Sequence, residues 1–254
     1  MIFTGETSVY DYLMKVREEK GAGFFVLMDP DRLSSGLVVK QAVQFAEAGV
    51  DAFLIGSSLM MNSGFDEYVE AISEVVDIPV IIFPAEGSHV TDRADAIFFL
   101  SLLSGRNPDL IIGEQVKSAP LIKNLGIEAI STAYLLVDSG RITSVEFISN
   151  TKPLPADKPE IALAHAMAAE IFGMKFVYLE AGSGALSPVP DDMISAVSGG
   201  VDLPVIVGGG IRNPETVAQK VAAGASFIVV GNYLEKSAHH RDIEDLINAA
   251  HTKV

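Results

Sequence analysis

Two glycine-ended apolar runs flank one short amphipathic segment in residues 204–232, PVIVGGGIRNPETVAQKVAAGASFIVVGN. Glycine lets backbone N–H groups approach a phosphate oxygen where a Cβ would intrude, and a helix N-terminus beside such a turn favours an anion. Gly209, Gly210, Gly231 and Asn232 are therefore candidate phosphate ligands. A tight turn without a ligand is the alternative interpretation. The stretch matches neither a dinucleotide-binding GxGxxG motif nor a P-loop.

The motif YLEAGSGA, residues 178–185, joins a single carboxylate to a Gly-Ser-Gly loop. Glu180 could accept a hydrogen bond from a substrate hydroxyl or remove its proton, which is general base chemistry. The glycines of the loop would let a small polar ligand come close to the backbone. A carboxylate held in a salt bridge is the alternative interpretation of Glu180.

A third motif, MDPDR at residues 28–32, offers a carboxylate for a metal ion. Mg²⁺ is commonly held by one or two carboxylates together with phosphate oxygens of a substrate, and Asp29 suits that role. Asp-Pro-Asp is also a frequent turn sequence, so the motif by itself fits a loop equally well. The sequence GSS, residues 56–58, could add a hydroxyl ligand or contact a phosphate.

Short β-branched or aromatic runs alternate with longer amphipathic segments, which is typical of βα units around a parallel sheet. Eight such runs predict a closed (β/α)8 TIM barrel formed by a single domain, residues 1–254. In this fold the loops after the strands share one end, and those after strands seven and eight commonly bind phosphate. The expected strands are 24–29, 51–56, 79–84, 95–100, about 127–137, 175–180, 204–208 and 226–231.

Helical segments are expected between most of these strands. The interval between the third and fourth strands, AEGSHVTDRA, is too short and lacks apolar periodicity, so the third helix should be missing or replaced by a loop. A helix over about 7–19 should cap the N-terminal end of the barrel, and residues 131–159 should form a hairpin-like excursion around a DSG turn. The other expected helices are 34–48, 65–76, about 113–124, 159–172, 190–197, 214–223 and 241–251.

Composition limits the partners of the chain. With 18 Lys and Arg against 33 Asp and Glu, the formal net charge of −15 disfavours nucleic acid and anionic membrane surfaces. The absence of cysteine excludes disulfides and thiolate chemistry, and the five histidines have no metal-ligand spacing. Neither a signal peptide nor a membrane-spanning run is present, so a soluble cytoplasmic protein is expected.

Apolar residues of the middle strands gather on one side of the expected barrel. Most of them belong to the core, but the absence of a third helix could expose a groove that suits a long hydrocarbon. The residues expected near this groove are Phe83, Phe98, Phe99, Leu102 and Leu103.

The motifs LMDPDR, GSS, SLLSGRNP, ITSVEFIS, YLEAGSGA, VGGGIRNPE and VVGN occur in this order across nearly the whole chain. This set resembles the geranylgeranylglyceryl phosphate synthase family, which includes the bacterial heptaprenylglyceryl phosphate synthases, and is closest to its second group. The resemblance implies a barrel prenyltransferase of ether phospholipid biosynthesis that joins the 3-hydroxyl of sn-glycerol 1-phosphate to C1 of a polyprenyl diphosphate, such as geranylgeranyl diphosphate. It also implies a homo-oligomer, a dimer or a hexamer.

The resemblance assigns roles by position. Asp29 and Ser58 would be Mg²⁺ ligands, and Glu180 would orient the glycerol hydroxyl and take its proton. The glycerol site would be lined by Tyr178, Leu179, Glu180, Ala181, Gly182, Ser183 and Gly184, and its phosphate held by Gly209, Gly210, Gly231 and Asn232.

One position departs from the family, because Leu27 stands where many members have lysine. Neutralisation of phosphate would then depend on Arg32, Arg212 or the metal. The groove would hold the prenyl tail, and contact with a bilayer would be transient and without an anchor.

Two other functions remain open from the residues. A sugar-phosphate isomerase of the phosphate-binding barrel class shares the strand seven and eight loops, but usually needs a second acid or a lysine at the rim. The fifth-strand region offers no Asp before Asp138. A non-catalytic glycerol phosphate-binding protein is the second alternative.

Overall fold

The computed structural model describes residues 7–32, 35–61, 63–231, 234 and 240–253. Its parallel strands close into a barrel in the order β1-β2-β3-β4-β5-β6-β7-β8, which confirms the predicted (β/α)8 fold. The strands are β1 Gly23–Met28, β2 Ala52–Ile55, β3 Val80–Ile82, β4 Ala96–Leu102, β5 Glu128–Leu136, β6 Phe176–Glu180, β7 Val205–Gly208 and β8 Phe227–Val230.

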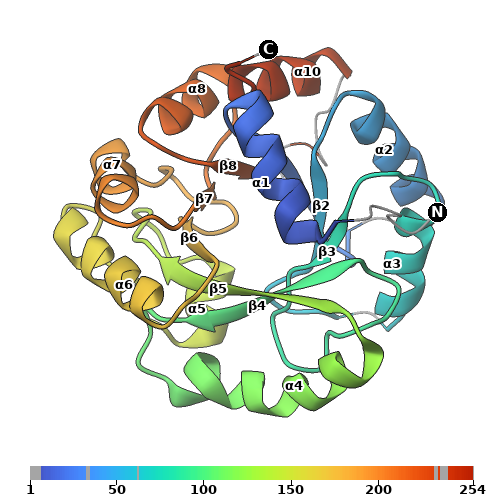
Figure 1. Ribbon diagram of the computed structural model, residues 1–254, viewed down its shortest axis with the longest axis horizontal. Coiled ribbons are helices and arrows are strands. Elements are labelled where there is room, and N and C mark those ends of the chain that lie inside the picture. The colour runs from blue at the N-terminus through green and yellow to red at the C-terminus, as the bar shows by residue number, and fades with distance from the viewer. Residues whose placement is uncertain (1–6, 33–34, 62, 232–233, 235–239, 254) are drawn as a thin grey trace.

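Helices form a ring around the barrel (Figure 1). Several begin with a proline or an acidic residue in the first turn, as α8 does with Pro214 and Glu215 behind an Asn213 cap. The described helices are α1 Val9–Lys20, α2 Ser35–Glu47, α3 Phe65–Ser73, the π-helix η1 Asp109–Gly113, α4 Glu114–Leu125, α5 Ser144–Ser149, α6 Pro159–Ile171, α7 Asp191–Gly200, α8 Pro214–Ala222 and α10 His240–Ala250. None of the described helices has the length and apolarity needed to cross a membrane.

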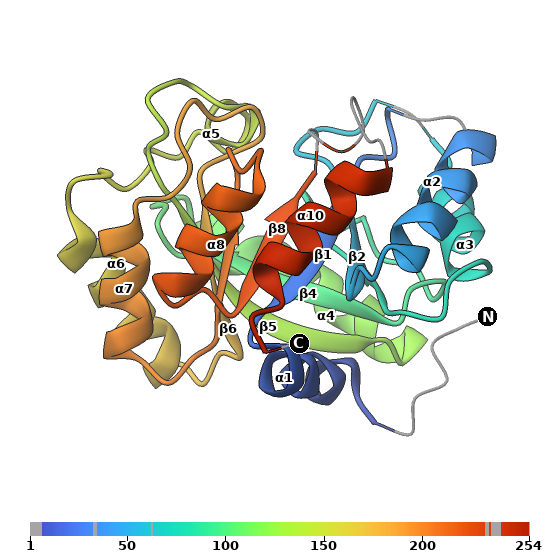
Figure 2. The same ribbon diagram turned by 90° about the horizontal axis from the view of Figure 1, so that it is seen from above.

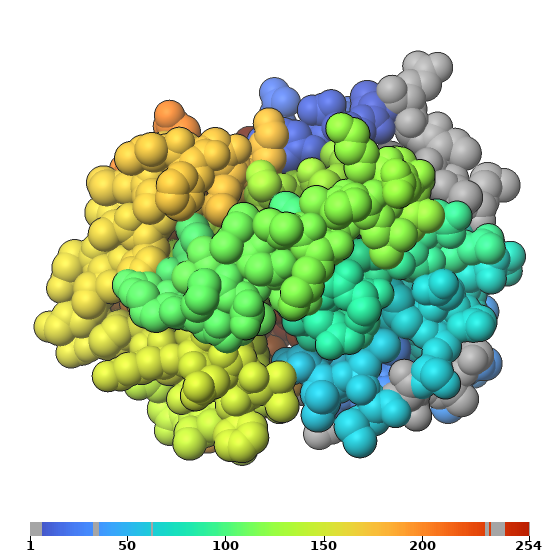
Figure 3. All heavy atoms as spheres, turned by 90° about the horizontal axis from the view of Figure 1, so that it is seen from below, coloured from blue at the N-terminus to red at the C-terminus, as the bar shows by residue number. Residues whose placement is uncertain are grey.

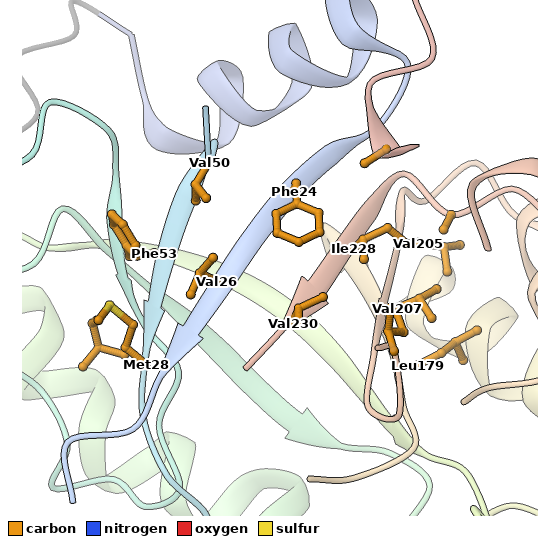
Figure 4. Close-up of a cluster of buried hydrophobic side chains, with 14 of the residues drawn as sticks. Phe24, Val26, Met28, Val50, Phe53, Leu179, Val205, Val207, Ile228 and Val230 are labelled. Carbon is orange, nitrogen blue, oxygen red and sulfur yellow. The ribbon is translucent and has the colours of Figure 1, made fainter. Parts of the chain in front are cut away.

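Side chains alternate between the two faces of each strand, which divides the core into two clusters. On β1, Phe25 points into the barrel and stacks on Phe227 at 4.9 Å between ring centroids. Phe24, Val26 and Met28 point outward toward the helices (Figure 4). The alternation also decides which residue at each strand end faces the barrel mouth.

Helix α1 closes the N-terminal end of the barrel, as predicted. The Glu128 carboxylate at the start of β5 accepts the backbone N–H groups of Val9 and Tyr10 at 2.6 and 3.0 Å. This carboxylate satisfies donors at the helix N-terminus and suits the positive end of its dipole. Figure 2 shows α1 across one end of the barrel and α5 at the opposite end, where the strands finish.

No helix separates β3 from β4, which confirms the prediction for the third helix. Residues 83–95 form turns and bends, and the Asp95 carboxylate accepts the Val80 N–H at 2.8 Å to hold the returning chain against β3. Phe65 of α3 stacks on His89 of this segment at 5.4 Å. The flank outside β3 and β4 therefore lacks the helix that would cover it in a regular barrel.

The prediction of a hairpin-like excursion after β5 is wrong. Only Val137 and Leu154 form a bridge, which is parallel, and the ITSVEFIS stretch contains helix α5. Thr143 accepts the N–H of Glu146 through its hydroxyl, and Asn150 ends the helix at φ 48°. The overlooked signal is the capping-box pattern TSVE, which favours a helix start over the β-propensity of its apolar residues.

Candidate active site

Glu180 is the last residue of β6, and its carboxylate points into the barrel mouth. The side chain is buried, and its Oε1 accepts the Gly182 N–H at 2.6 Å. Burial raises the pKa of Glu180 to about 7, although the hydrogen bond from Gly182 acts in the opposite direction. A carboxyl group with this pKa can exchange a proton near neutral pH.

The three glycines at the end of β7, Gly208–Gly210, form the wall against which Glu180 packs. A Cβ on Gly208 would lie 2.6 Å from Glu180 Oε2, and one on Gly209 would lie 2.4 Å from Glu180 Oε1. Gly209 and Gly210 have φ angles of 83° and 74°, which side chains rarely allow. At the other side of the loop, a Cβ on Gly210 would meet the Pro188 backbone at 2.9 Å. The GGG sequence therefore makes room for the carboxylate at the barrel mouth.

Three aromatic rings lie between Glu180 and the opposite side of the mouth. Tyr178 packs on Phe83 and Tyr134 with centroid distances of 5.3 and 5.4 Å. The Tyr178 hydroxyl is buried beside the Glu180 carboxylate, since a Cβ on Gly208 would lie 2.5 Å from the hydroxyl and 2.6 Å from Glu180 Oε2, and this hydroxyl acts to lower the pKa of Glu180. Burial raises the pKa of both tyrosines well above the usual value, and the nearby Glu180 charge adds to this. The two phenols therefore stay neutral hydrogen-bond donors.

Asp29 lies at the mouth directly after β1 and gathers polar groups from two loops. Its Oδ2 accepts the Arg32 Nε at 3.0 Å and the Ser57 hydroxyl at 3.3 Å, and its Oδ1 accepts the Asp31 N–H at 3.1 Å. Ser58 lies on the same wall. Among the described residues no three His, Cys, Asp or Glu side chains gather as metal ligands. A hard cation here would depend on Asp29, the serine hydroxyls, water and a substrate.

A cavity of about 440 Å³ runs from this mouth to the flank that lacks a helix. Its walls include inward-facing Phe83 and Tyr134 but also outward-facing Ile97 and Phe99, so the cavity passes over the edge of the barrel. Figure 3 shows a hollow between the green segment of η1 and α4, the yellow-green segment of α5 and the cyan segment after β2. The arrangement combines a polar mouth with a long apolar groove.

Comparison with known proteins places this site in a family. Residues 14–250 match the family described as PcrB. The chain belongs to the PcrB family. Two curated relatives named geranylgeranylglyceryl phosphate synthase come from Chitinophaga pinensis and Thermococcus kodakarensis. They are 45% and 43% identical over 92% and 93% of this chain, and 94% and 92% of their own lengths are covered.

A solved structure of the same class has the same barrel. It is (S)-3-O-geranylgeranylglyceryl phosphate synthase from Thermoplasma acidophilum in complex with substrate sn-glycerol-1-phosphate. The TM-score is 0.91 at 33% identity, with 96% of this chain and 99% of the other covered. The resemblance of the sequence motifs to the geranylgeranylglyceryl phosphate synthase family is therefore confirmed.

Two residues of the YLEAGSG motif do not face the mouth. Leu179 and Ala181 point outward into the cluster between the sheet and the helices, where Figure 4 shows Leu179 near Val207. Their neighbours Tyr178 and Glu180 point inward because side chains alternate along a strand. The side chains of Leu179 and Ala181 therefore do not face the mouth, whereas Ser183 reaches the cavity wall. That these positions bind a substrate stays a prediction.

Two further predicted residues lie in the loops after β7 and β8. Gly231 follows β8 and packs over Leu27, since a Cβ on it would meet the Leu27 carbonyl oxygen at 3.2 Å. Arg212 donates to the Ala185 carbonyl oxygen at 2.5 Å and so ties the β7 loop to the β6 loop. Asn232 lies outside the described residues.

The groove prediction is confirmed for three of five residues. Phe83, Phe99 and Leu102 line the cavity, whereas Phe98 points into the barrel interior and Leu103 packs on the outer cluster. Sequence reasoning missed Tyr134 and the α5 residues Val145 and Ile148, all of which line the cavity. Tyr134 pairs with Tyr178 in the strand register, so the alternation on β5 was an available signal.

Because Gly209 packs on Glu180, an alanine there should destabilise the protein more than an alanine at a glycine with open space around it. Gly209→Ala should lower the free energy of unfolding by about 2–4 kcal/mol, because it adds a left-handed alanine and a clash with the carboxylate. The matched change is Gly184→Ala, at φ 76° with nothing within 4 Å of the new Cβ. It should cost only about 1–2 kcal/mol, the penalty for the backbone conformation alone. Urea denaturation of both variants checks this, and equal losses would contradict the packing argument.

The raised pKa of Glu180 predicts a pH dependence of stability. The folded protein holds this proton with a pKa of about 7 against an ordinary value of 4.5, so it binds more protons than the unfolded chain between these values. The free energy of unfolding should therefore fall as pH rises through that window, by about 3 kcal/mol. Glu180→Gln should remove this loss, and the exposed Glu160→Gln should retain it. Urea denaturation between about pH 4 and 8 measures the difference; parallel curves for all three proteins would contradict the prediction.

Proposed function

We propose that this chain is a prenyltransferase that joins the 3-hydroxyl of sn-glycerol 1-phosphate to C1 of a polyprenyl diphosphate. The product is a 3-O-prenylglyceryl phosphate, an ether lipid precursor, and diphosphate is released. The observation that carries the proposal is the cavity, which connects the polar mouth at Asp29 to an apolar groove along the flank without a helix. The names of the relatives and the ligand of the Thermoplasma acidophilum protein support this assignment.

The polar groups around Glu180 suit the glycerol phosphate. The backbone between Gly208 and Gly210 lies beside the carboxylate and precedes α8, whose N-terminus favours an anion. Glu180 would orient the 3-hydroxyl and accept its proton as the new bond forms. Its pKa of about 7 places it near the protonation balance that a general base needs at neutral pH.

The groove suits the prenyl tail. Phe83, Phe99 and Leu102 supply apolar surface from the mouth to the flank, and burial of a hydrocarbon there gains free energy in proportion to the area removed from water. The tail would direct C1 to the mouth, within reach of both the glycerol hydroxyl and Asp29. Glu180 and the glycine turn do not line this cavity, so the glycerol phosphate would lie beside it at the mouth. Holding the two substrates side by side would convert their encounter into an oriented reaction.

The residues at Asp29 fit a divalent cation. A carboxylate that already receives a serine hydroxyl, next to a second serine, is a set of hard oxygen donors of the kind that Mg²⁺ prefers. Asp29 and Ser58 would hold the ion, with Ser57 orienting the carboxylate. When bound, Mg²⁺ would offset the negative charge that develops on the departing diphosphate.

The transfer breaks one bond at C1, forms another there, and moves one proton to Glu180. The bond between C1 and the diphosphate oxygen breaks with its electron pair leaving on diphosphate, and O3 of the glycerol phosphate donates an electron pair to C1. Glu180 accepts the O3 proton. Arg32, whose Nε bonds to Asp29, is positioned at the cavity wall to face the diphosphate charge in place of the lysine that Leu27 replaces.

An isomerase barrel would use a further carboxylate from β5, and this strand supplies none to the mouth. On β5 the inward positions nearest the mouth are Tyr134 and Leu136, and Leu136 lies opposite Glu180 in the register. The single inward acid of β6 therefore favours proton acceptance from one hydroxyl over a two-residue proton shuttle.

A transfer assay tests the proposed function. Radiolabelled sn-glycerol 1-phosphate is incubated with Mg²⁺ and prenyl diphosphates of increasing length, with the sn-3 phosphate as control. Product from the sn-1 isomer alone is expected, with the most efficient donor identifying the chain length. Binding of glycerol phosphate without turnover of any donor would identify a non-catalytic binding protein instead.

A further inference from the structure

Large apolar side chains are exposed on three separate loops around the barrel mouth. The first loop follows β2, the second carries α5, and the third follows β6. Among the apolar side chains of these three loops, Phe147 and Met61 have the largest exposed fractions, 77% and 78%. Six of the sixteen large apolar side chains exposed on the described residues gather on this rim, and apolar groups that gather mark an interaction site more than singly scattered ones do. The exposed rim consists of Leu59, Met61, Ile142, Phe147, Ile148 and Leu186.

This exposed rim is continuous with the cavity. Leu59 and Ile148 are about half exposed and also line the cavity wall, so apolar surface extends without interruption from the groove to solvent. The loops lie at the end of the barrel opposite α1 (Figure 2). Figure 3 shows the segment after β2 and the α5 segment on two sides of the hollow. A long apolar ligand could enter or leave between them.

We propose that the exposed rim docks on the surface of a lipid bilayer. Its apolar side chains would enter the boundary between headgroups and acyl chains, where such groups bind reversibly without spanning the membrane. The second step rests on the proposed function: a prenyl diphosphate dissolved in the bilayer would slide its tail into the groove. A protein partner seated on the rim would instead close the cavity mouth, which argues against a second copy of this chain as the occupant.

Charge determines which bilayer is preferred. The chain carries a formal net charge of −15, so anionic lipids repel it at long range. Docking is therefore driven by apolar burial, and it should be stronger on zwitterionic vesicles. On anionic vesicles it should increase with salt, because screening reduces the repulsion. Docking through a basic patch would show the opposite salt dependence.

Flotation of the full chain with phosphatidylcholine vesicles tests the proposal. The double variant Met61→Ser and Phe147→Ser changes two exposed residues outside the cavity wall, and should reduce the partition coefficient by at least about tenfold. The matched control is Ile171→Ser and Phe172→Ser, which removes two apolar side chains with exposed fractions of 84% and 69% at the end of α6, where the chain returns to the barrel's N-terminal end. The control should float like the unmodified protein.

Three outcomes would overturn the proposal: no flotation of the unmodified protein, equal loss in both double variants, or flotation that decreases with salt on phosphatidylglycerol vesicles. A fall in oligomeric mass of the rim variant without vesicles, measured by light scattering, would identify a second copy as the occupant and also refute bilayer docking. Transfer from geranyl diphosphate, a short soluble donor, is measured separately without vesicles. If the unmodified protein transfers from geranyl diphosphate but does not float, the proposed function stands and the docking is refuted. If it floats but does not transfer, the docking stands and the proposed function is refuted.

Discussion

Glu180→Gln is expected to lower kcat of prenyl transfer by about 10²–10⁴-fold, because the glutamine cannot accept the proton of the glycerol hydroxyl. The amide is close in size to the carboxylate, and its oxygen can still accept the Gly182 N–H that Oε1 now receives. The dissociation constant of sn-glycerol 1-phosphate should therefore change little. Single-turnover assays give the rate, and calorimetric titration gives the affinity.

The exposed Glu160→Gln is the control for this change, since it removes the same charge from the first turn of α6. It should leave both the rate and the affinity unchanged. Equal losses of rate and affinity in Glu180→Gln would mean that Glu180 only binds the substrate. A full rate in this variant at neutral pH would refute its role as the base.

Asp29→Asn is expected to remove most of the activity, by about 10²–10³-fold, together with the response of the rate to Mg²⁺. The amide retains one oxygen but loses the charge that would hold a hard cation, and the ion pair between Arg32 and this carboxylate is lost. Initial rates across a Mg²⁺ titration measure both effects.

Asp31→Asn provides the matched control, because it lies in the same loop and its carboxylate accepts the Met61 N–H at 2.6 Å. This variant should keep the Mg²⁺ response. Mg²⁺-dependent turnover of Asp29→Asn at the unmodified rate would show that the metal, if required, binds elsewhere. Loss of the Mg²⁺ response in Asp31→Asn alone would point to the second acid of the motif.

The strands and the missing helix could be predicted because their signals are local. A run such as FVLM in β1 or FIVV in β8 is too short and too apolar for a surface helix, and it ends at a turn residue. The segment between β3 and β4 has no apolar period at all. By contrast, α5 was misread as an extended run because its six residues are too few to establish a helical period, so that its start depended on the Thr143 cap.

The site residues at strand ends could also be predicted from local signals, whereas the contacts between loops could not. Motif chemistry located Glu180 and Asp29 at strand ends, and both lie at the mouth. Whether Ser57 or Ser58 contacts the Asp29 carboxylate depends on how the β2 loop turns, which the sequence GSS does not reveal; the hydrogen bond comes from Ser57. The outward direction of Leu179 followed from strand alternation and could have been read from the sequence.

The sequence by itself determined the order of the elements, the residues at the strand ends and the interval that lacks a helix, because each depends on neighbours within a few positions. Tertiary structure decided which of these residues meet. Closure of β8 onto β1 brings Gly231 over Leu27, and the packing of the β6 and β7 loops buries Glu180 and raises its pKa. Burial and cavity shape come from contacts between segments far apart in the chain, and no local pattern encodes those distances.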